Sequence, residues 1–239
     1  MREARSGASL LARSIMSVAV AVRARNEIVL ATDTLTCFGS RRVPPQNHRA
    51  VKIREIGQAL MASTGWGIYE NLFDDFLSGR PAPELRDSKA IFAFFNRFWR
   101  ALHTRYSLVN EQCNSKDSPF GDLDSTFLVV NPNGIFCVES DMSVTQFRQY
   151  YAIGSGANYS LGALHVLYDP EGDPELLARR AVEAAIALDT GCGGEILLRR
   201  LRAAPPRRGR PGAPSRRVRP ARGRARRTGT PPGGGAVRG

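Results

Sequence analysis

Short apolar segments arranged in pairs mark the first part of the chain. Residues 17–23 (SVAVAVR) and 27–32 (EIVLAT) are rich in β-branched and small apolar side chains, and only three residues separate them. This pattern predicts a hairpin of two buried strands. Residues 51–56 and 59–63 repeat the pattern around a glycine turn, and the polar stretch 34–50 between the two hairpins predicts a loop.

The rest of the hydrophobic pattern predicts two pairs of helices and three further strands. Apolar residues spaced three and four apart predict one helix after Gly65 and a longer helix capped by Asp87 or Ser88. A second pair of helices is expected to begin after Gly156 and after Asp173. The further strands are expected at residues 126–130, 135–139 and 146–153.

The order of these elements decides the fold class. The strands come in hairpins and do not alternate with helices, which argues against a parallel sheet. We expect an α+β fold in which two antiparallel sheets face each other and a pair of helices covers each outer face, a four-layer αββα sandwich. Residues 17–198 are expected to form this domain.

The positive charge of the chain is confined to one end. The 239 residues carry a formal charge of +12, but residues 199–239 hold 14 Arg and neither Asp nor Glu, leaving 20 basic and 22 acidic side chains elsewhere. This segment is rich in Pro and Gly and has no aromatic residue for base stacking, so we expect a disordered tail. Three explanations stay open: a sequence read out of frame, a solvated tail, or a nucleic-acid-binding segment, which the missing aromatics disfavour.

Composition excludes several other classes of protein. No apolar run reaches the roughly 20 residues of a membrane-spanning helix, and residues 1–16 lack the apolar core of a signal peptide. The cysteines Cys37, Cys113, Cys137 and Cys192 are far apart and form no Cys-x-x-Cys pair, which argues against a zinc site and a disulfide framework. We therefore expect a cytoplasmic protein without a metal or cofactor.

The first hairpin suggests a chemical function. If its turn is centred on Arg25, Ser17 at the start of one strand lies opposite Asp33 at the end of the next, with Cβ atoms about 5 Å apart. Ser17 also follows Met16, so loss of the preceding residues would leave a serine that carries both a hydroxyl and a free α-amine. Because an α-amine has a pKa of about 7.7–8.0, it can accept the hydroxyl proton near neutral pH.

Five further landmarks follow in order along the chain. They are Ala31-Thr32-Asp33, Ala50-Val51-Lys52-Ile53, Ala62-Ser63-Thr64-Gly65, Ala152-Ile153-Gly154-Ser155-Gly156-Ala157 and Leu188-Asp189-Thr190-Gly191-Cys192-Gly193-Gly194. With Ser17, this series resembles the proteasome β-type subunits of the N-terminal nucleophile hydrolase superfamily, most closely the bacterial relatives of ATP-dependent protease rings. The resemblance implies a peptidase that acts on peptides or proteins, assembles into a homo-oligomeric ring and leaves room for an ATPase partner.

The resemblance also implies a role for each residue around the nucleophile. Ser17 occupies the position of the N-terminal nucleophile, which is usually threonine in the family. Asp33 and Lys52 match the carboxylate and the lysine beside it, and Lys52 is one of three lysines among 34 basic residues. Gly65 matches the glycine whose backbone N–H faces the oxyanion of the tetrahedral intermediate.

Three other residues match the surroundings of the terminal amine. Ser155 and Asp189 correspond to groups that hydrogen-bond around the amine and its water, and Cys192 occupies a position where the family has serine. Since a thiol is a weaker donor than a hydroxyl, the network is expected to be weaker here. The family also continues past the Gly-Gly with further strands, which an Arg/Pro/Gly-rich segment is not expected to supply.

Several alternatives stay open at this stage. Residues 1–16 are a leader, a propeptide or the product of a start codon assigned too early. The chain could be a catalytically silent ring subunit or an amidohydrolase of the same superfamily that acts on a small molecule. An arginine-rich protein associated with nucleic acid is a further, less favoured, alternative.

Overall fold

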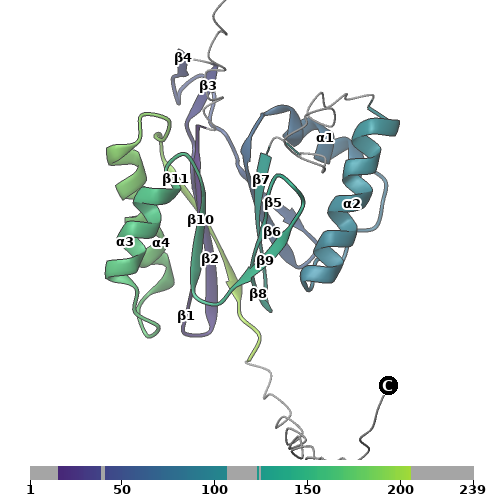
Figure 1. The fold of residues 1–239 in the computed structure, drawn as a ribbon. Helices are drawn as coiled ribbons and strands as arrows, with labels where there is room; N and C mark the ends of the chain where they lie inside the picture. The colour runs from purple at the N-terminus through teal and green to yellow at the C-terminus, as the bar shows by residue number, and fades with distance from the viewer. Residues whose placement is uncertain (1–15, 39–40, 107–122, 124, 206–239) are drawn as a thin grey trace, which may run out of the picture. The chain divides into compact units, whose positions relative to one another are not determined.

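The described part of the chain comprises residues 16–38, 41–106, 123 and 125–205 in a computed structural model (Figure 1). Residues 1–15, Cys113 and residues 206–239 lie outside it. The predictions for the leader and for most of the tail are therefore not tested by the structure.

The first sheet has four antiparallel strands in the order β10-β1-β2-β11. The strands are β1 (Val18–Ala24), β2 (Glu27–Asp33), β10 (Tyr150–Gly154) and β11 (Ile196–Arg202). Strands β1 and β2 form the predicted hairpin and lie at the centre of the sheet, where almost all their residues are buried. A residue at the start of β1 is therefore held by neighbours on both sides.

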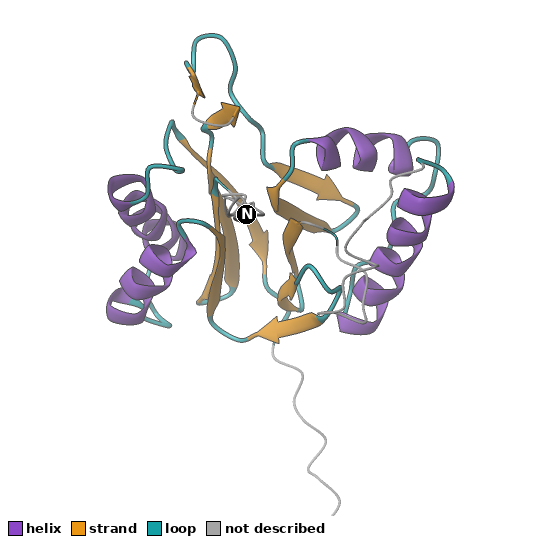
Figure 2. Ribbon diagram, turned by 45° about the horizontal axis from the view of Figure 1, so that its top comes forward, coloured by secondary structure: helices purple, strands orange, loops and turns teal. Residues whose placement is uncertain are grey.

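The second sheet has five strands in sequence order. They are β5 (Ile53–Ile56), β6 (Ala59–Gly65), β7 (Ser125–Asn131), β8 (Gly134–Val138) and β9 (Val144–Phe147). Within the region predicted as a loop, β3 (Thr36–Phe38) and β4 (Arg41–Val43) pair into a short ribbon that rises above the sheets in Figure 2. Each hairpin predicted for this sheet is present.

Two pairs of helices form the outer layers (Figure 1). The pair α1 (Ile68–Leu77) and α2 (Ser88–Thr104) covers the second sheet, and the pair α3 (Ala157–Leu167) and α4 (Pro174–Leu188) covers the first. The predicted caps are present, since Asp87 accepts a hydrogen bond from the Ala90 N–H at 2.9 Å and Asp173 accepts one from Glu175 at 3.0 Å. The expected αββα sandwich of two antiparallel sheets is confirmed.

The cores on the two sides of the second sheet differ in composition. The core beneath α1 and α2 is aromatic, with the Phe73 ring stacked on Phe98 at a centroid distance of 4.0 Å. The core between the sheets contains small residues such as Ala19, Ala21 and Ala62. This core also contains branched residues such as Ile28, Leu30 and Leu128, so the two sheets pack against each other through small and large side chains together.

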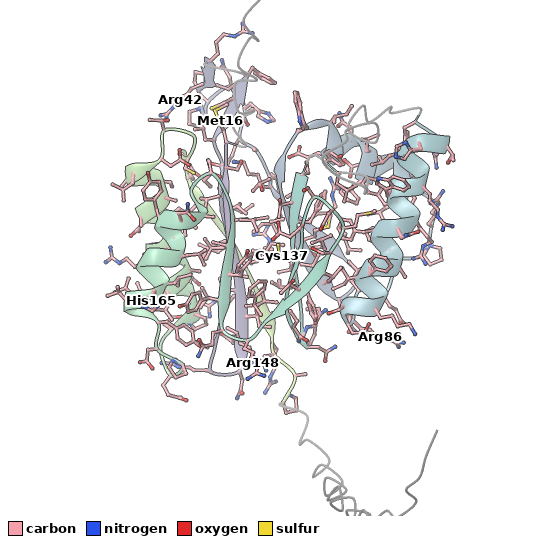
Figure 3. The ribbon with its side chains drawn as sticks, in the orientation of Figure 1. Met16, Arg42, Arg86, Cys137, Arg148 and His165 are labelled. Carbon is pink, nitrogen blue, oxygen red and sulfur yellow. The ribbon has the colours of Figure 1, made fainter. Side chains whose placement is uncertain are left out.

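The single strand predicted over residues 146–153 is wrong. The chain leaves the second sheet at the end of β9 and enters the first sheet at β10, with Arg148 and Gln149 between them. Arg148 marks this crossing at the base of the sheets in Figure 3. The segment looks continuous in sequence because both strands have strand-forming residues, but each pairs with a different sheet.

The ordered body extends past the boundary expected at residue 198. Strand β11 pairs with β2 from Ile196 opposite Asp33 to Arg202 opposite Glu27. Beyond it, the Ala203 N–H donates a hydrogen bond of 2.7 Å to the Asn26 carbonyl. The first arginines of the basic segment therefore lie in a strand, where an edge position leaves their side chains exposed.

No helix in the described ranges is long and apolar enough to cross a membrane. Within the same ranges, no group of three or more His, Cys, Asp or Glu side chains is placed to hold a metal ion.

Candidate active site

Ser17 lies immediately before β1 and is 7% exposed. Its hydroxyl oxygen accepts a hydrogen bond from Lys52 Nζ at 2.9 Å. Lys52 precedes β5 of the second sheet, so this contact joins the ends of the two sheets. Met16, the residue before Ser17, lies near the β3–β4 ribbon (Figure 3).

Asp33 is the other partner of Lys52. Its Oδ1 atom lies 2.6 Å from Lys52 Nζ, and the Asp33 side chain is fully buried while that of Lys52 is 8% exposed. The two charges therefore compensate each other away from solvent, and the position of the ammonium is fixed beside the Ser17 hydroxyl.

Backbone N–H groups complete the surroundings of the Asp33 carboxylate. Oδ1 accepts a hydrogen bond from Val18 at 3.1 Å, and Oδ2 accepts bonds from Leu35 at 3.3 Å and Gly193 at 3.1 Å. Both oxygens are thus satisfied by elements from three parts of the chain, which holds the carboxylate rigidly.

The direct pairing predicted between Ser17 and Asp33 is wrong by one residue. Ala19 lies opposite Thr32 and Ala24 opposite Glu27, so the turn is centred between Arg25 and Asn26 and not on Arg25. The two-residue turn is made possible by a left-handed backbone at Arg25, whose φ is 50°. Lys52, approaching from the other sheet, connects the hydroxyl and the carboxylate instead.

Ser155 lies on the other side of Ser17. The Ser17 N–H donates to Ser155 Oγ at 3.4 Å, and Ser155 Oγ donates to the Ser17 carbonyl at the same distance of 3.4 Å. The nitrogen that would become the α-amine on cleavage after Met16 therefore already faces Ser155. The sequence-predicted residues on this side are brought together with the nucleophile.

Asp189 and Cys192 extend this side of the site. Asp189 accepts hydrogen bonds from the Gly191 N–H at 2.8 Å and from Cys192 Sγ at 3.5 Å. Burial raises the pKa of Asp189, but hydrogen bonds from Ser155, Gly191 and Cys192 outweigh it and leave the pKa below its usual value. Asp189 is therefore ionised at neutral pH and can orient donors next to the Ser17 nitrogen.

Cys192 is buried and protonated. Burial, reinforced by the charges of Asp33 and Asp189, raises the pKa of its thiol to about 12. The thiol can therefore donate a hydrogen bond to Asp189, although a weak one, and it is not a nucleophile near neutral pH.

A cleft of about 770 Å³ opens beside Ser17. Residues Leu35–Phe38 line one part of it and residues Gly65–Ile68 line another. Gly65 ends β6 with a φ of 133°, a conformation that favours glycine. Of the sequence-predicted site residues, Ser17, Lys52 and Gly65 line the cleft. Asp33 is buried beside Lys52, and Ser155, Asp189 and Cys192 form the adjoining network.

Two positions beside Ser17 have no room for a side chain, which the sequence pattern did not reveal. A Cβ atom on Gly154 would lie 2.2 Å from the Ser17 carbonyl oxygen, and one on Gly156 would lie 2.7 Å from Cys192 Sγ. In the sequence, Gly154-Ser155-Gly156 is part of one landmark and precedes a predicted helix. Its glycines are needed because the Ser17 backbone and Cys192 pack directly against them.

Comparison with known proteins shows which proteins this arrangement resembles. No protein-family profile matches the chain. The proteasome subunit beta of Saccharomonospora viridis is 49% identical over 55 residues, which are 22% of this chain and 19% of that protein. The match therefore spans about a fifth of the length of that curated relative.

Solved structures match over a longer range. BPH from Thiobacillus denitrificans, determined in complex with epoxomicin, has 28% identity and a TM-score of 0.71 over 79% of this chain and 100% of that one. The chain is related to the proteasome β-type N-terminal nucleophile hydrolases. The same BPH without the compound gives the same TM-score of 0.71 over 99% of its length.

A eukaryotic protein also shares the fold. HslV from Trypanosoma brucei matches 77% of this chain and 99% of its own with a TM-score of 0.52 and 19% identity, a likeness that concerns the fold alone. The relationship predicted from Ser17 and the five landmarks is confirmed by the curated match and the BPH structures.

Proposed function

We propose that the chain is a proteasome β-like peptidase that hydrolyses peptide bonds with Ser17 as its N-terminal nucleophile. The observation that carries this proposal is the cluster in which Lys52 Nζ lies 2.9 Å from Ser17 Oγ and 2.6 Å from Asp33 Oδ1. It requires cleavage of the Met16–Ser17 bond, because only then does Ser17 possess a free amine.

The first step is attack of Ser17 Oγ on the carbonyl carbon of a bound peptide. The hydroxyl proton moves to the terminal amine, which acts as general base. Lys52 donates its hydrogen bond to the developing negative charge on Oγ, and Asp33 keeps the ammonium in place. The carbonyl oxygen becomes an oxyanion, for which the Gly65 backbone N–H is the proposed donor.

The following steps release the two products. Collapse of the tetrahedral intermediate breaks the C–N bond, and the terminal amine returns its proton to the leaving nitrogen. Water then attacks the acyl-enzyme, and the same amine takes one proton from it and restores the Ser17 hydroxyl. Ser155, which accepts a hydrogen bond from the Ser17 N–H, and Asp189, which is hydrogen-bonded to Ser155, would position the amine for both transfers.

The proposal also covers the assembly, the cellular location and the partners of the protein. We expect a homo-oligomeric ring in the cytoplasm that receives peptides or proteins, with an ATPase as a partner that would deliver folded substrates. Closed symmetric assembly is the common state of soluble homo-oligomers.

Hydrolysis of short peptides by the purified chain tests the proposal. We expect Ser17→Ala to lower kcat/KM by at least about 1000-fold, since the nucleophile and its amine act as one unit. Ser78→Ala is the matched control, because Ser78 is exposed at the end of α1 and should leave the rate unchanged.

The same assay separates the alternatives. Cleavage of small amides but not of peptides would favour a small-molecule amidohydrolase. A folded ring that cleaves neither and begins at Met1 would favour a catalytically silent subunit.

A further inference from the structure

A narrow hollow of about 10 Å³ adjoins the large cleft beside Ser17. The two spaces share Lys52, Ser63 and Glu70, and Asn71 lines the larger one. The region next to the nucleophile is therefore polar on one side, although the helix α1 that supplies Glu70 and Asn71 is otherwise packed into an aromatic core.

All but one of the charged side chains that border these two spaces form an ion pair in the described part of the chain. Lys52 is compensated by Asp33, and the Arg54 guanidinium, which borders the hollow, is paired with Asp74. Arg54 also donates to the backbone carbonyl of Glu70 at 3.2 Å. Within the described part of the chain, the Glu70 carboxylate forms no ion pair of its own, so the region carries one uncompensated negative charge.

The cleft offers apolar as well as charged contacts. Ala50, Trp66 and Ile68 line it together with Glu70, and the lining also contains the titratable groups of His48 and Cys37. A long side chain with a methylene stem and a cationic end would bury the stem against the apolar residues and place the charge near the carboxylate.

We propose that Glu70 makes this site select substrates with Lys or Arg on the carbonyl side of the cleaved bond. The inference rests on the proposed function, because the side chain that enters this cleft is that of the residue acylating Ser17. Glu70 would act on substrate binding and not on the chemical step. An aspartate or glutamate side chain at the same place would meet a like charge and be disfavoured.

Glu70 also has a simpler structural explanation. It lies in the first turn of α1, which has no side-chain cap, and an acidic residue there stabilises a helix. That explanation predicts an effect of substitution on thermal stability alone. Substrate preference is the readout that separates the two.

The test uses three fluorogenic peptides that differ only in the residue before the cleaved bond: Arg, Leu or Glu. For the unmodified protein we expect kcat/KM for the Arg peptide to exceed that for the Leu peptide by about fivefold, as for one exposed charge pair. Glu70→Gln should remove this preference through KM with kcat unchanged, and Glu70→Lys should make the Glu peptide better than the Arg peptide. Glu84→Gln, an exposed glutamate outside the cleft, is the matched control.

The possible results separate the inference from the function it rests on. Cleavage of the Leu peptide with an Arg-to-Leu ratio that Glu70→Gln leaves unchanged would overturn the inference and leave the peptidase intact. A loss of thermal stability without a change in that ratio would assign Glu70 to the helix alone and also overturn it. Absence of cleavage of all three peptides, together with an unreactive Ser17, would overturn both.

Discussion

The Lys52 ammonium lies 2.9 Å from the Ser17 hydroxyl oxygen, although the two residues belong to the ends of different sheets. A contact across the sandwich depends on the packing of the whole body, because both sheets must be in place before the two side chains meet. The site is therefore assembled by the fold and not by a local loop.

Replacing Lys52 should affect both activity and stability. In Lys52→Ala, the Asp33 carboxylate stays buried without its ion-pair partner, which should cost about 3 kcal/mol of unfolding free energy. We expect kcat to fall at least about 100-fold, since the alkoxide loses its neighbouring cation. Urea denaturation and peptide hydrolysis measure the two effects. Lys89→Ala, at an exposed lysine of α2, should change neither.

The close approach of Gly154 to Ser17 predicts opposite effects at two glycines. Gly154→Ala would place a Cβ 2.2 Å from the Ser17 carbonyl oxygen at a φ of 99° and should destabilise the protein by at least about 3 kcal/mol. Gly162→Ala, in helix α3 with nothing within 4 Å of the new Cβ, should stabilise it by about 0.5–1 kcal/mol. Equal thermal stability of the two variants would contradict this packing.

Cys192 should make stability depend on alkaline pH. Its thiol has a pKa of about 12 in the folded chain against a reference value of 9.0, so the unfolded chain loses this proton first. The resulting stabilisation is complete below pH 9 and is lost as the pH rises toward 12. The decline in unfolding free energy above pH 9 should therefore be smaller in Cys192→Ser than in the unmodified protein. Parallel pH profiles for the two proteins would count against the buried protonated thiol.

The end of the chain offers a comparison of two truncations. A chain ending after Leu198 loses four residues of β11, together with the pairing of Arg200 with Glu27 and Glu175. A chain ending after Pro205 keeps them. We expect the shorter chain to have a melting temperature at least about 5 °C lower, as for a loss of about 2 kcal/mol in a domain of this size. Identical melting curves would mean that β11 contributes nothing to the body.

Sequence patterns predicted the elements of this fold better than their pairing. The hairpin of β1 and β2 follows from its apolar residues, but its register depends on the left-handed conformation of Arg25, which no composition rule favours. Likewise, the arginines of β11 look like part of the tail because a strand at a sheet edge can leave long charged side chains in solvent.

The candidate site also contains residues that the sequence predicted and one that it did not. Ser17, Asp33 and Lys52 were predictable because a family pattern fixes their order along the chain, and the structure brings them together. Glu70 carries no such signal, since a glutamate in the first turn of a helix is ordinary. Its position becomes informative only when the neighbouring charges are seen to be paired.

Covalent labelling of the N-terminal residue tests the central claim most directly. The purified protein would be treated with a β-lactone, and its intact mass and labelled peptide determined by mass spectrometry. We expect a mature chain that begins at Ser17, with one acyl group on the Ser17 oxygen and none on the Ser17→Ala variant. A mature chain that retains Met16 and takes up no label would contradict it.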